Sequence, residues 1–405
     1  MTRETINHGA KKVILLSALF LVMIAWDRPR TTTSASALPN FSSAEAAATQ
    51  TAKQEETVEQ KRKNIQVLKG LPESQLFLVM NFIADALGVH CDYCHVNKGT
   101  DPKTGNDIWV WESDDKQKKI VARQMMRMVL DINKANFGGS QAVTCYSCHR
   151  GGTSVAREVP LPPRDYAVAK PDEKEAALPT AGQILNKYVA AVGGENAWAR
   201  FKTIVMKGTL ERPRGRNADR SLNIGQDAVE ITMKGPDKYL AKLTTPQGIA
   251  IQCINGTVAW VSNNNGAQQL SAEDLERSKR ILARYSIIKV TEAPERMSVT
   301  GTEIIGGREA YVVATRIDAN RANKYFFDKQ TGLLLRQIAT TETLLAPLLE
   351  QVDFEDYRDV NGAKLPFIVR TANVAVFDTT RRRFTEIKLN TTVEDAIFNM
   401  PAAPK

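Results

Sequence analysis

Cysteine and histidine are scarce in this chain. Its 405 residues include five cysteines and four histidines. A disulfide framework is typical of small secreted domains, whereas a chain of this length has room for two or three domains that each bury a core without covalent links. We therefore expect the few cysteines to serve chemistry rather than stability.

Other absences narrow the classes of protein further. The chain is 43% hydrophobic and 24% charged, with 24 glycines and 17 prolines, which excludes a disordered chain, a collagen and a multi-span membrane protein. The sequence contains no βαβ rhythm and no phosphate-binding loop. Its formal charge of +9 is mild and it has no basic, aromatic-rich stripe, so we expect no nucleic-acid partner.

Residues 1–37 have the pattern of an export signal. Lys11 and Lys12 precede the apolar run Val13–Trp26, and Ala35-Ser36-Ala37 offers a small-residue cleavage site. The run is short for a membrane span, and an uncleaved N-terminal anchor is the alternative. We therefore expect a periplasmic protein, which an uncleaved segment would tether to the inner membrane.

The composition changes three times after this segment. Residues 38–65 are rich in small and then charged residues and are expected to form a tether. Residues 66–152 have a helical composition. Five prolines between residues 153 and 179 indicate a linker, because proline continues neither helices nor central strands. From residue 180 to 405 the pattern alternates with period two, which is typical of antiparallel strands.

Two helices are expected in the 66–152 domain. The first covers Glu73–Leu87, between Pro72 at its start and Gly88 at its C-terminal cap. The second is expected to begin at Ser113 as N-cap and to run to about Asn133.

The 180–405 domain is expected to hold one amphipathic helix and a sheet. The helix covers Ala181–Val192, and a further helical stretch is expected near Ala272–Arg284. Turn signals such as Asn361-Gly362 separate the alternating segments. Those segments include Thr203–Glu211, Ala228–Lys234, Val299–Ile305, Tyr311–Ile317, Lys324–Phe327 and Glu386–Asn390.

Four of the cysteines and two of the histidines fall into two copies of one motif. The copies are Cys91-Asp92-Tyr93-Cys94-His95 and Cys145-Tyr146-Ser147-Cys148-His149. Two cysteines at this spacing can form thioethers with the vinyl groups of one haem, and the histidine that follows becomes its proximal iron ligand. The sequence therefore predicts two haem c groups, bound through Cys91, Cys94, Cys145 and Cys148, with His95 and His149 on the irons.

Three other uses of Cys-x-x-Cys fit less well. The motifs start 54 residues apart, whereas paired zinc knuckles are usually about 15–20 residues apart. A redox-active pair would sit in a βαβ setting, and a disulfide framework belongs to small domains.

Methionine is the better candidate for the sixth iron ligand. His8 lies in the signal, and His90 adjoins Cys91 too closely to reach across its own haem. Met80 lies on the apolar face of the first helix, eleven residues before Cys91, although a space-filling core methionine is the alternative. For the second haem, spacing alone does not choose among Met125, Met126 and Met128. A thioether ligand closes the iron and favours electron transfer over catalysis.

Residues 66–163 resemble one two-haem half of the tetrahaem cytochrome c subunit of photosynthetic reaction centres. The matching segments are Ala84–His95 (ADALGVHCDYCH), Val121–Asn133 (VARQMMRMVLDIN) and Val143–Gly151 (VTCYSCHRG). The resemblance implies Met80 and Met125 as distal ligands, with Met128 as the second choice for the second haem. It also implies a membrane-associated electron-transfer complex, or a quinol-oxidising one, as partner.

The chain departs from the family before its second motif. The bis-histidine haem of the family takes a ligand from this loop, and residues 137–144 contain no histidine. We therefore expect two haems rather than four.

Residues 180–405 are similar to the half-barrel of outer-membrane lipoprotein carriers. The similarity rests on Tyr325-Phe326-Phe327-Asp328 with Thr331-Gly332-Leu333, and on Asp356-Tyr357-Arg358-Asp359 with Gly362. A curved sheet under a helix can enclose an apolar ligand or serve as a docking platform, and the absence of converging polar groups favours docking. Cys253, in the strand-like stretch Ile249–Ile254, is expected to be a buried thiol.

The sequence as a whole predicts an α + β protein of two domains: an α-helical dihaem cytochrome c domain followed by an antiparallel β half-barrel with packed helices. The expected function is single-electron transfer by a periplasmic cytochrome rather than an enzyme. Two alternatives stay open. One is a haem-dependent oxidoreductase with one open iron, and the other is a hydrophobic-ligand carrier whose haems sense redox state.

Overall fold

A computed structural model describes most of the chain from residue 55 onward. The described residues are 55–100, 107–155, 178–194, 201–216, 221–235, 237–271, 274–275, 278–279 and 294–401. The expected signal, most of the tether and the centre of the proline-rich linker lie outside these ranges, as does most of the helix expected near Ala272–Arg284. Within the described ranges no helix is both long and apolar enough to cross a membrane.

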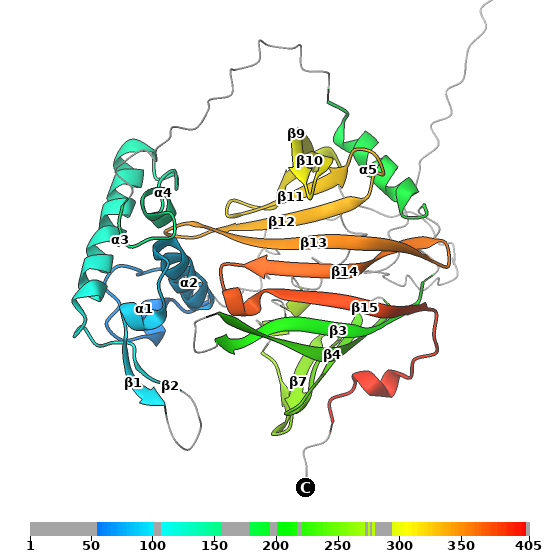
Figure 1. The fold of residues 1–405 in the computed structure, drawn as a ribbon, viewed down its shortest axis with the longest axis horizontal. Helices are drawn as coiled ribbons and strands as arrows, with labels where there is room; N and C mark the ends of the chain where they lie inside the picture. Colours follow the sequence, from blue (N-terminus) through cyan, green and yellow to red (C-terminus); the bar gives the residue numbers. More distant parts are fainter. Residues whose placement is uncertain are drawn as a thin grey trace, which may run out of the picture.

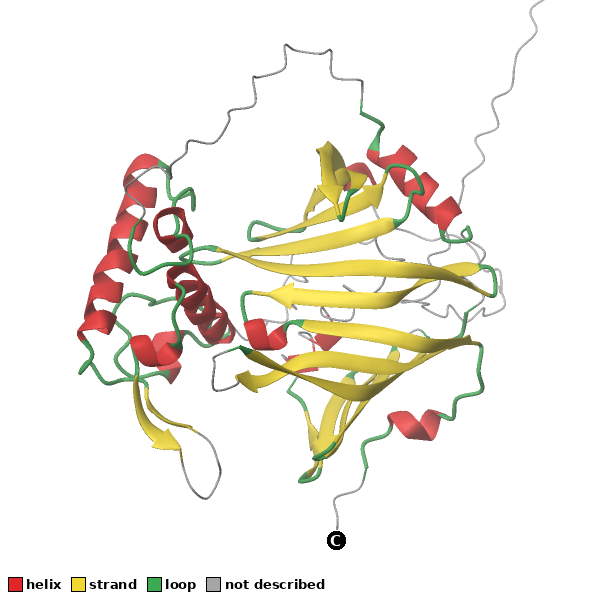
Figure 2. Cartoon of the chain, in the orientation of Figure 1, coloured by secondary structure: helices red, strands yellow, loops and turns green. Residues whose placement is uncertain are grey.

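The N-terminal part is mainly helical and stands at one end of a large sheet (Figures 1 and 2). Its elements are α1 (Val58–Lys61), η1 (Glu73–Gln75), α2 (Leu76–Leu87), η2 (Cys91–Tyr93), β1 (Val96–Thr100), β2 (Asp107–Val110), α3 (Gln117–Asn136) and α4 (Cys145–His149). The β1–β2 hairpin follows directly on the first cysteine motif and is not among the elements expected from the sequence.

Helix α2 confirms the first expected helix, together with the short turn η1. Gly88 caps it with φ of +63°, a left-handed conformation that glycine adopts without strain. The expected start of the second helix is wrong, because α3 begins at Gln117. Ser113 instead accepts a hydrogen bond from the Asp115 amide at 3.1 Å, and Asp114 forms ion pairs with Lys119 and Arg123 on α3. These contacts hold residues 113–115 in a turn ahead of the helix.

Thirteen strands form one antiparallel sheet, as the alternating pattern predicts. Their spatial order is β8-β7-β6-β5-β4-β3-β15-β14-β13-β12-β11-β10-β9. Asn361 and Gly362 both adopt positive φ in the turn between β13 and β14, as an Asn-Gly hairpin requires. The strands are β3 (Thr203–Arg216), β4 (Leu222–Lys234), β5 (Lys238–Thr245), β6 (Gly248–Asn255), β7 (Val258–Asn263), β8 (Gly266–Gln269), β9 (Met297–Ile305), β10 (Arg308–Arg316), β11 (Arg321–Asp328), β12 (Leu334–Glu342), β13 (Pro347–Val360), β14 (Ala363–Asn373) and β15 (Thr380–Leu389).

The two faces of the sheet pack against different partners. On one face α5 (Ala181–Ala191) buries Ile184, Leu185 and Tyr188 against the main core, so the first helix expected in this domain is confirmed. Leu240 of β5 points to the other face of the sheet, because the side chains of successive strand residues alternate between the two faces. There it packs with Cys253, Trp260 and Phe398 of η6 (Asp395–Phe398).

The helical part and the sheet share one apolar cluster. The loop between β12 and β13 contributes Leu345, which is fully buried, and β13 contributes Leu348. They pack with a group from the helical part that consists of Val58, Leu68, Leu71, Val79 and Met126. The β12–β13 hairpin is therefore part of the core on which α2 and α3 rest.

Candidate functional site

The first motif forms one tight turn after the cap of α2. The amide of His95 donates to the carbonyl of Cys91 at 2.9 Å, which brings the two ends of the motif onto the same turn. Cys91 is exposed, and Cys94 and His95 are half-buried. The Nδ1 atom of His95 is buried and has no hydrogen-bond partner among the described residues.

The second motif is the short helix α4. Thr144 caps it, and the preceding loop is tied to α3 by the buried Asn133. The Asn133 amide group donates to the carbonyl of Val143 at 2.7 Å and accepts from the amide of Val143 at 2.9 Å. His149 Nδ1 lies 3.0 Å from the carbonyl of Gly152, which fixes Nδ1 as the donor and leaves Nε2 as the free nitrogen.

The two motifs meet through a close backbone contact. The amide of Gly151, two residues after His149, donates to the carbonyl of Ala86 in α2 at 2.9 Å. A Cβ atom on Gly88 would lie 2.2 Å from the carbonyl oxygen of Gly151. Gly88 therefore serves both as a cap and as the point where α2 touches the end of α4, and motifs 54 residues apart become neighbours.

The comparisons with known proteins match this part of the chain. Residues 23–189 match the family model of the photosynthetic reaction centre cytochrome c subunit. This segment resembles a reaction-centre cytochrome c.

Two curated relatives give the extent of the likeness. Cytochrome c-554 of Chloroflexus aurantiacus is 36% identical over 93 residues, which are 21% of this chain and 20% of that protein. The photosynthetic reaction center cytochrome c subunit of Thermochromatium tepidum is 37% identical over 95 residues, which are 22% of this chain and 20% of that one. The chain thus spans about a fifth of the length of these curated relatives.

Solved structures similar to this chain include two half-barrel proteins. A DUF1329 family protein from Desulfovibrio piger covers 54% of this chain and 95% of its own at a TM-score of 0.37 and 12% identity. A LolA superfamily protein from Nitrosomonas europaea covers 55% of this chain and 98% of its own at a TM-score of 0.36 and 13% identity.

A reaction-centre cytochrome c family implies covalently bound haem c, and the residues present fit that group. The four motif cysteines are free thiols, and Nδ1 of His95 is a buried polar atom without a hydrogen-bond partner among the described residues. Nδ1 of His149 is held by a backbone carbonyl, as in a metal-ligating histidine, which leaves Nε2 for the iron. Several large apolar side chains of α2, α3 and α4 are exposed, which suits contact with a porphyrin. They are Phe77 (59% exposed), Met125 (41%), Met128 (44%) and Tyr146 (56%).

The cysteine environment does not suit a redox-active pair. Burial raises the pKa of the thiols of Cys94 and Cys145. An attacking cysteine needs a lowered pKa instead. In addition, the described residues contain no group of three or more His, Cys, Asp or Glu side chains arranged to hold a metal ion.

The methionines of α3 point to different surroundings. Met126 is 8% exposed and packs in the cluster shared with the β12–β13 hairpin, whereas Met125 and Met128 face outward. Met80 of α2 is half-buried and packs against the same cluster. Sequence spacing left these three α3 residues equivalent, and their burial separates them.

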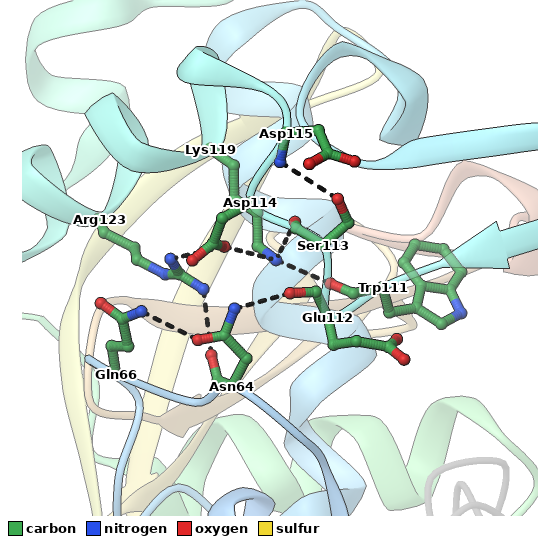
Figure 3. Close-up of polar contacts among 9 residues, drawn as sticks. All are labelled: Asn64, Gln66, Trp111, Glu112, Ser113, Asp114, Asp115, Lys119 and Arg123. Carbon is green, nitrogen blue, oxygen red and sulfur yellow. Dashed lines mark hydrogen bonds and ion pairs between the residues drawn. The ribbon is translucent and has the colours of Figure 1, made fainter.

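Two features beside the first motif were not found from sequence. The β1–β2 hairpin stacks Trp109 on Trp111 with ring centroids 4.7 Å apart, and Trp111 meets the ring of His95 edge-on at 5.0 Å. Behind Trp111, Lys119 and Arg123 are buried on α3 (Figure 3). In the sequence, the hairpin is indicated only by the alternation of Trp109 and Trp111. Nothing in the sequence indicates that Lys119 and Arg123 are buried.

The sheet holds a separate cavity of about 670 Å³ over β3 to β8. Its apolar wall comes from Leu210, Val229, Ile231, Leu243 and Val261, and Arg382 lies on its border. Cys253 is on the opposite face with 0% exposure, where burial raises its pKa to about 12, so the expectation of a buried thiol is confirmed.

Proposed function

We propose that this protein is an exported dihaem c-type cytochrome that passes single electrons between a membrane-associated or quinol-oxidising complex and a second partner. Cys91 and Cys94 would hold the first haem, with His95 as proximal and Met80 as distal ligand. The same roles at the second haem would belong to Cys145, Cys148, His149 and Met125.

Haem supplies the one-electron chemistry, and the chain supplies ligands, position and electrostatics. The carbonyl of Gly152 orients the ring of His149, and Asn133 holds the loop that leads into its helix. Methionine ligands would close both irons to small molecules.

The observation that carries the proposal is the contact between the motifs. The hydrogen bond from Gly151 to Ala86 and the close approach at Gly88 put the two attachment sequences side by side. Neighbouring haems exchange electrons within one protein, which is what a carrier between two partners needs.

Haem attachment tests the proposal directly. The purified exported protein should have the mass of its polypeptide plus two porphyrins, and its absorption after alkaline pyridine treatment should give two haems per chain. Cys94→Ser and Cys148→Ser should each leave one thioether and a loosely held haem. Cys253→Ser is the matched control and should keep both haems, because this thiol is buried on the far face of the sheet. A colourless protein without added mass would refute the proposal.

An open iron is the enzymatic alternative, and carbon monoxide separates the two. A carrier with two closed irons should not bind carbon monoxide in its ferrous form, whereas a haem-dependent oxidoreductase should bind one equivalent quickly.

The cavity of the sheet supports a second candidate, a carrier of an apolar ligand whose haems sense redox state. Its volume of about 670 Å³ and the apolar side chains on part of its wall suit an acyl chain or a similar molecule. Native mass spectrometry of the freshly purified protein would reveal a retained lipid, and a ligand-free spectrum after gentle purification would count against this candidate.

A further inference from the structure

Lys119 and Arg123 are two cations buried side by side on α3. They are four residues apart, so they lie on one face of the helix, and only 8% of Lys119 and 7% of Arg123 is exposed. Lysine and arginine are almost never this buried unless they are paired.

A single carboxylate serves both cations. Asp114 Oδ1 lies 2.8 Å from Arg123 Nη1 and 3.3 Å from Lys119 Nζ. The Arg123 guanidinium holds the pKa of Asp114 well below its usual range, so this carboxylate is ionised at neutral pH. The cluster of Asp114, Lys119 and Arg123 therefore carries one net positive charge.

Backbone carbonyls accept further hydrogen bonds from the two cations. Lys119 Nζ donates to the carbonyls of Trp111 at 2.8 Å and Ser113 at 2.7 Å, and Arg123 Nη2 donates to the carbonyl of Asn64 at 3.0 Å (Figure 3). Carbonyls satisfy the hydrogen bonds without cancelling the charge. The acids nearest in sequence, Glu112 and Asp115, are exposed, so water screens their carboxylates.

Trp111 connects the buried Lys119 to the first haem motif. Lys119 holds the carbonyl of this residue, and its ring lies 5.0 Å from the ring of His95. Trp111 therefore contacts both the buried Lys119 and the ring of His95.

Oxidation of a haem adds one positive charge to the iron. A buried cation disfavours that oxidised form, and its effect is strong because low dielectric surroundings screen it little. The second motif has no matching charge: Arg127 and Arg150 are exposed, and Lys119 and Arg123 are the only lysine or arginine residues that are buried in the described part of the chain.

We propose that Lys119 and Arg123 act as positioning and tuning residues that selectively raise the reduction potential of the haem held by Cys91, Cys94 and His95. This inference rests on the proposed function. It adds an asymmetry between the two haems, which biases where the electron resides within the pair.

Redox titration of the full-length protein, followed by haem absorption, tests the inference. Lys119→Met removes the charge and keeps the length of the side chain. It should lower one of the two midpoint potentials by about 59 mV, which for one electron corresponds to a change of about tenfold in the reduction equilibrium constant. Lys119→Arg keeps the charge and should change the reduction equilibrium constant of neither haem by more than about twofold. Asp114→Asn removes the negative charge that offsets the two cations and should raise the same midpoint potential.

Lys118→Met is the matched control. This neighbouring lysine is exposed, and its Nζ lies 5.6 Å from the centre of the Tyr93 ring. Because water screens its charge, its loss should change the reduction equilibrium constant of neither haem by more than about twofold.

The opposite signs expected for Lys119→Met and Asp114→Asn separate charge from damage. If both variants shift the potential in one direction, if both haems shift equally, or if neither shifts, the inference is overturned. The haem content of each variant is measured first. Two haems with unmoved potentials reject only this inference, whereas absence of haem from the unmodified protein rejects the proposed function.

Discussion

At the scale of the single residue, Asn133 holds the loop that leads into the second motif. It is 5% exposed and pairs with both backbone groups of Val143. Asn133→Ala would leave those groups unpaired, at a cost of about 2 kcal/mol. Urea denaturation should show this loss of unfolding free energy, and attachment at Cys145 and Cys148 should become incomplete. Asn136→Ala is the control: its exposed amide contacts only its own helix, and the change should cost less than about 0.5 kcal/mol. Equal losses for the two variants would contradict the role of Asn133.

The three methionines of α3 allow a comparison at neighbouring positions. Met125→Ala should open one iron, which carbon monoxide binding would report, with little effect on stability because Met125 is 41% exposed. Met126→Ala should leave both irons closed and cost about 2–3 kcal/mol, because it creates a cavity in the shared core. If Met128→Ala opens the iron and Met125→Ala does not, the assignment moves one turn along the helix.

Asp114 gives a pH dependence with a defined sign. The hydrogen bonds from Arg123, and next from Asn64, lower its pKa in the folded protein from the ordinary value of 3.8. A depressed folded pKa means stability that is complete above about pH 4 and is lost as pH falls toward the folded pKa. The urea midpoint of the unmodified protein should therefore fall more steeply below pH 4 than that of Asp114→Asn. Parallel curves for the two proteins would contradict the ion pairs.

At the scale of the element, what the sequence predicts depends on how local the deciding contact is. The end of α2 is predictable because Gly88 supplies its own left-handed cap. The start of α3 is not, because Ser113 and Asp114 have the pattern of a cap, whereas Asp114 forms ion pairs with Lys119 and Arg123 inside the helix. The cysteine motifs can be recognised from the spacing of their residues alone. Their proximity in the fold cannot be predicted in this way, because it depends on contact between Gly88 and Gly151.

The β12–β13 hairpin is an element whose tip supports a different part of the fold. Leu345 is fully buried in the shared cluster, and its neighbour Leu344 is 39% exposed. Leu345→Ala should lower the free energy of unfolding by about 3 kcal/mol through the cavity it leaves. Leu344→Ala should change it by less than about 0.5 kcal/mol. Urea denaturation of both variants measures the contrast, and similar losses would mean that the hairpin does not rest in the core.

At the scale of the whole molecule, the shared cluster couples α2 and α3 to the sheet. Period-two alternation predicts the strands, but their order depends on the long-range pairing of β15 with β3, and the shared cluster joins Leu345 to Val79, which is more than 250 positions away. No local pattern records these contacts. The main core beneath α5 does not include the hairpin tip, so the sheet has apolar packing independent of the helical part.

This arrangement predicts where damage to the hairpin will appear. Leu345→Asp places a charge in the shared cluster and should loosen α2 and α3, which rest on it, more than β3 and β4, which lie in the main core. Hydrogen exchange followed by mass spectrometry should show faster exchange in peptides from α2 and α3 and nearly unchanged exchange in peptides from β3 and β4. Because α2 carries Met80, the proposed distal ligand of the first haem, the absorption band that reports methionine on ferric iron should weaken in the same variant. Leu344→Asp, at the exposed neighbouring position, should leave exchange and absorption as in the unmodified protein. Uniformly faster exchange across helices and sheet would instead mean that the two parts unfold as one unit, and unchanged exchange in α2 would mean that the hairpin does not support α2 and α3.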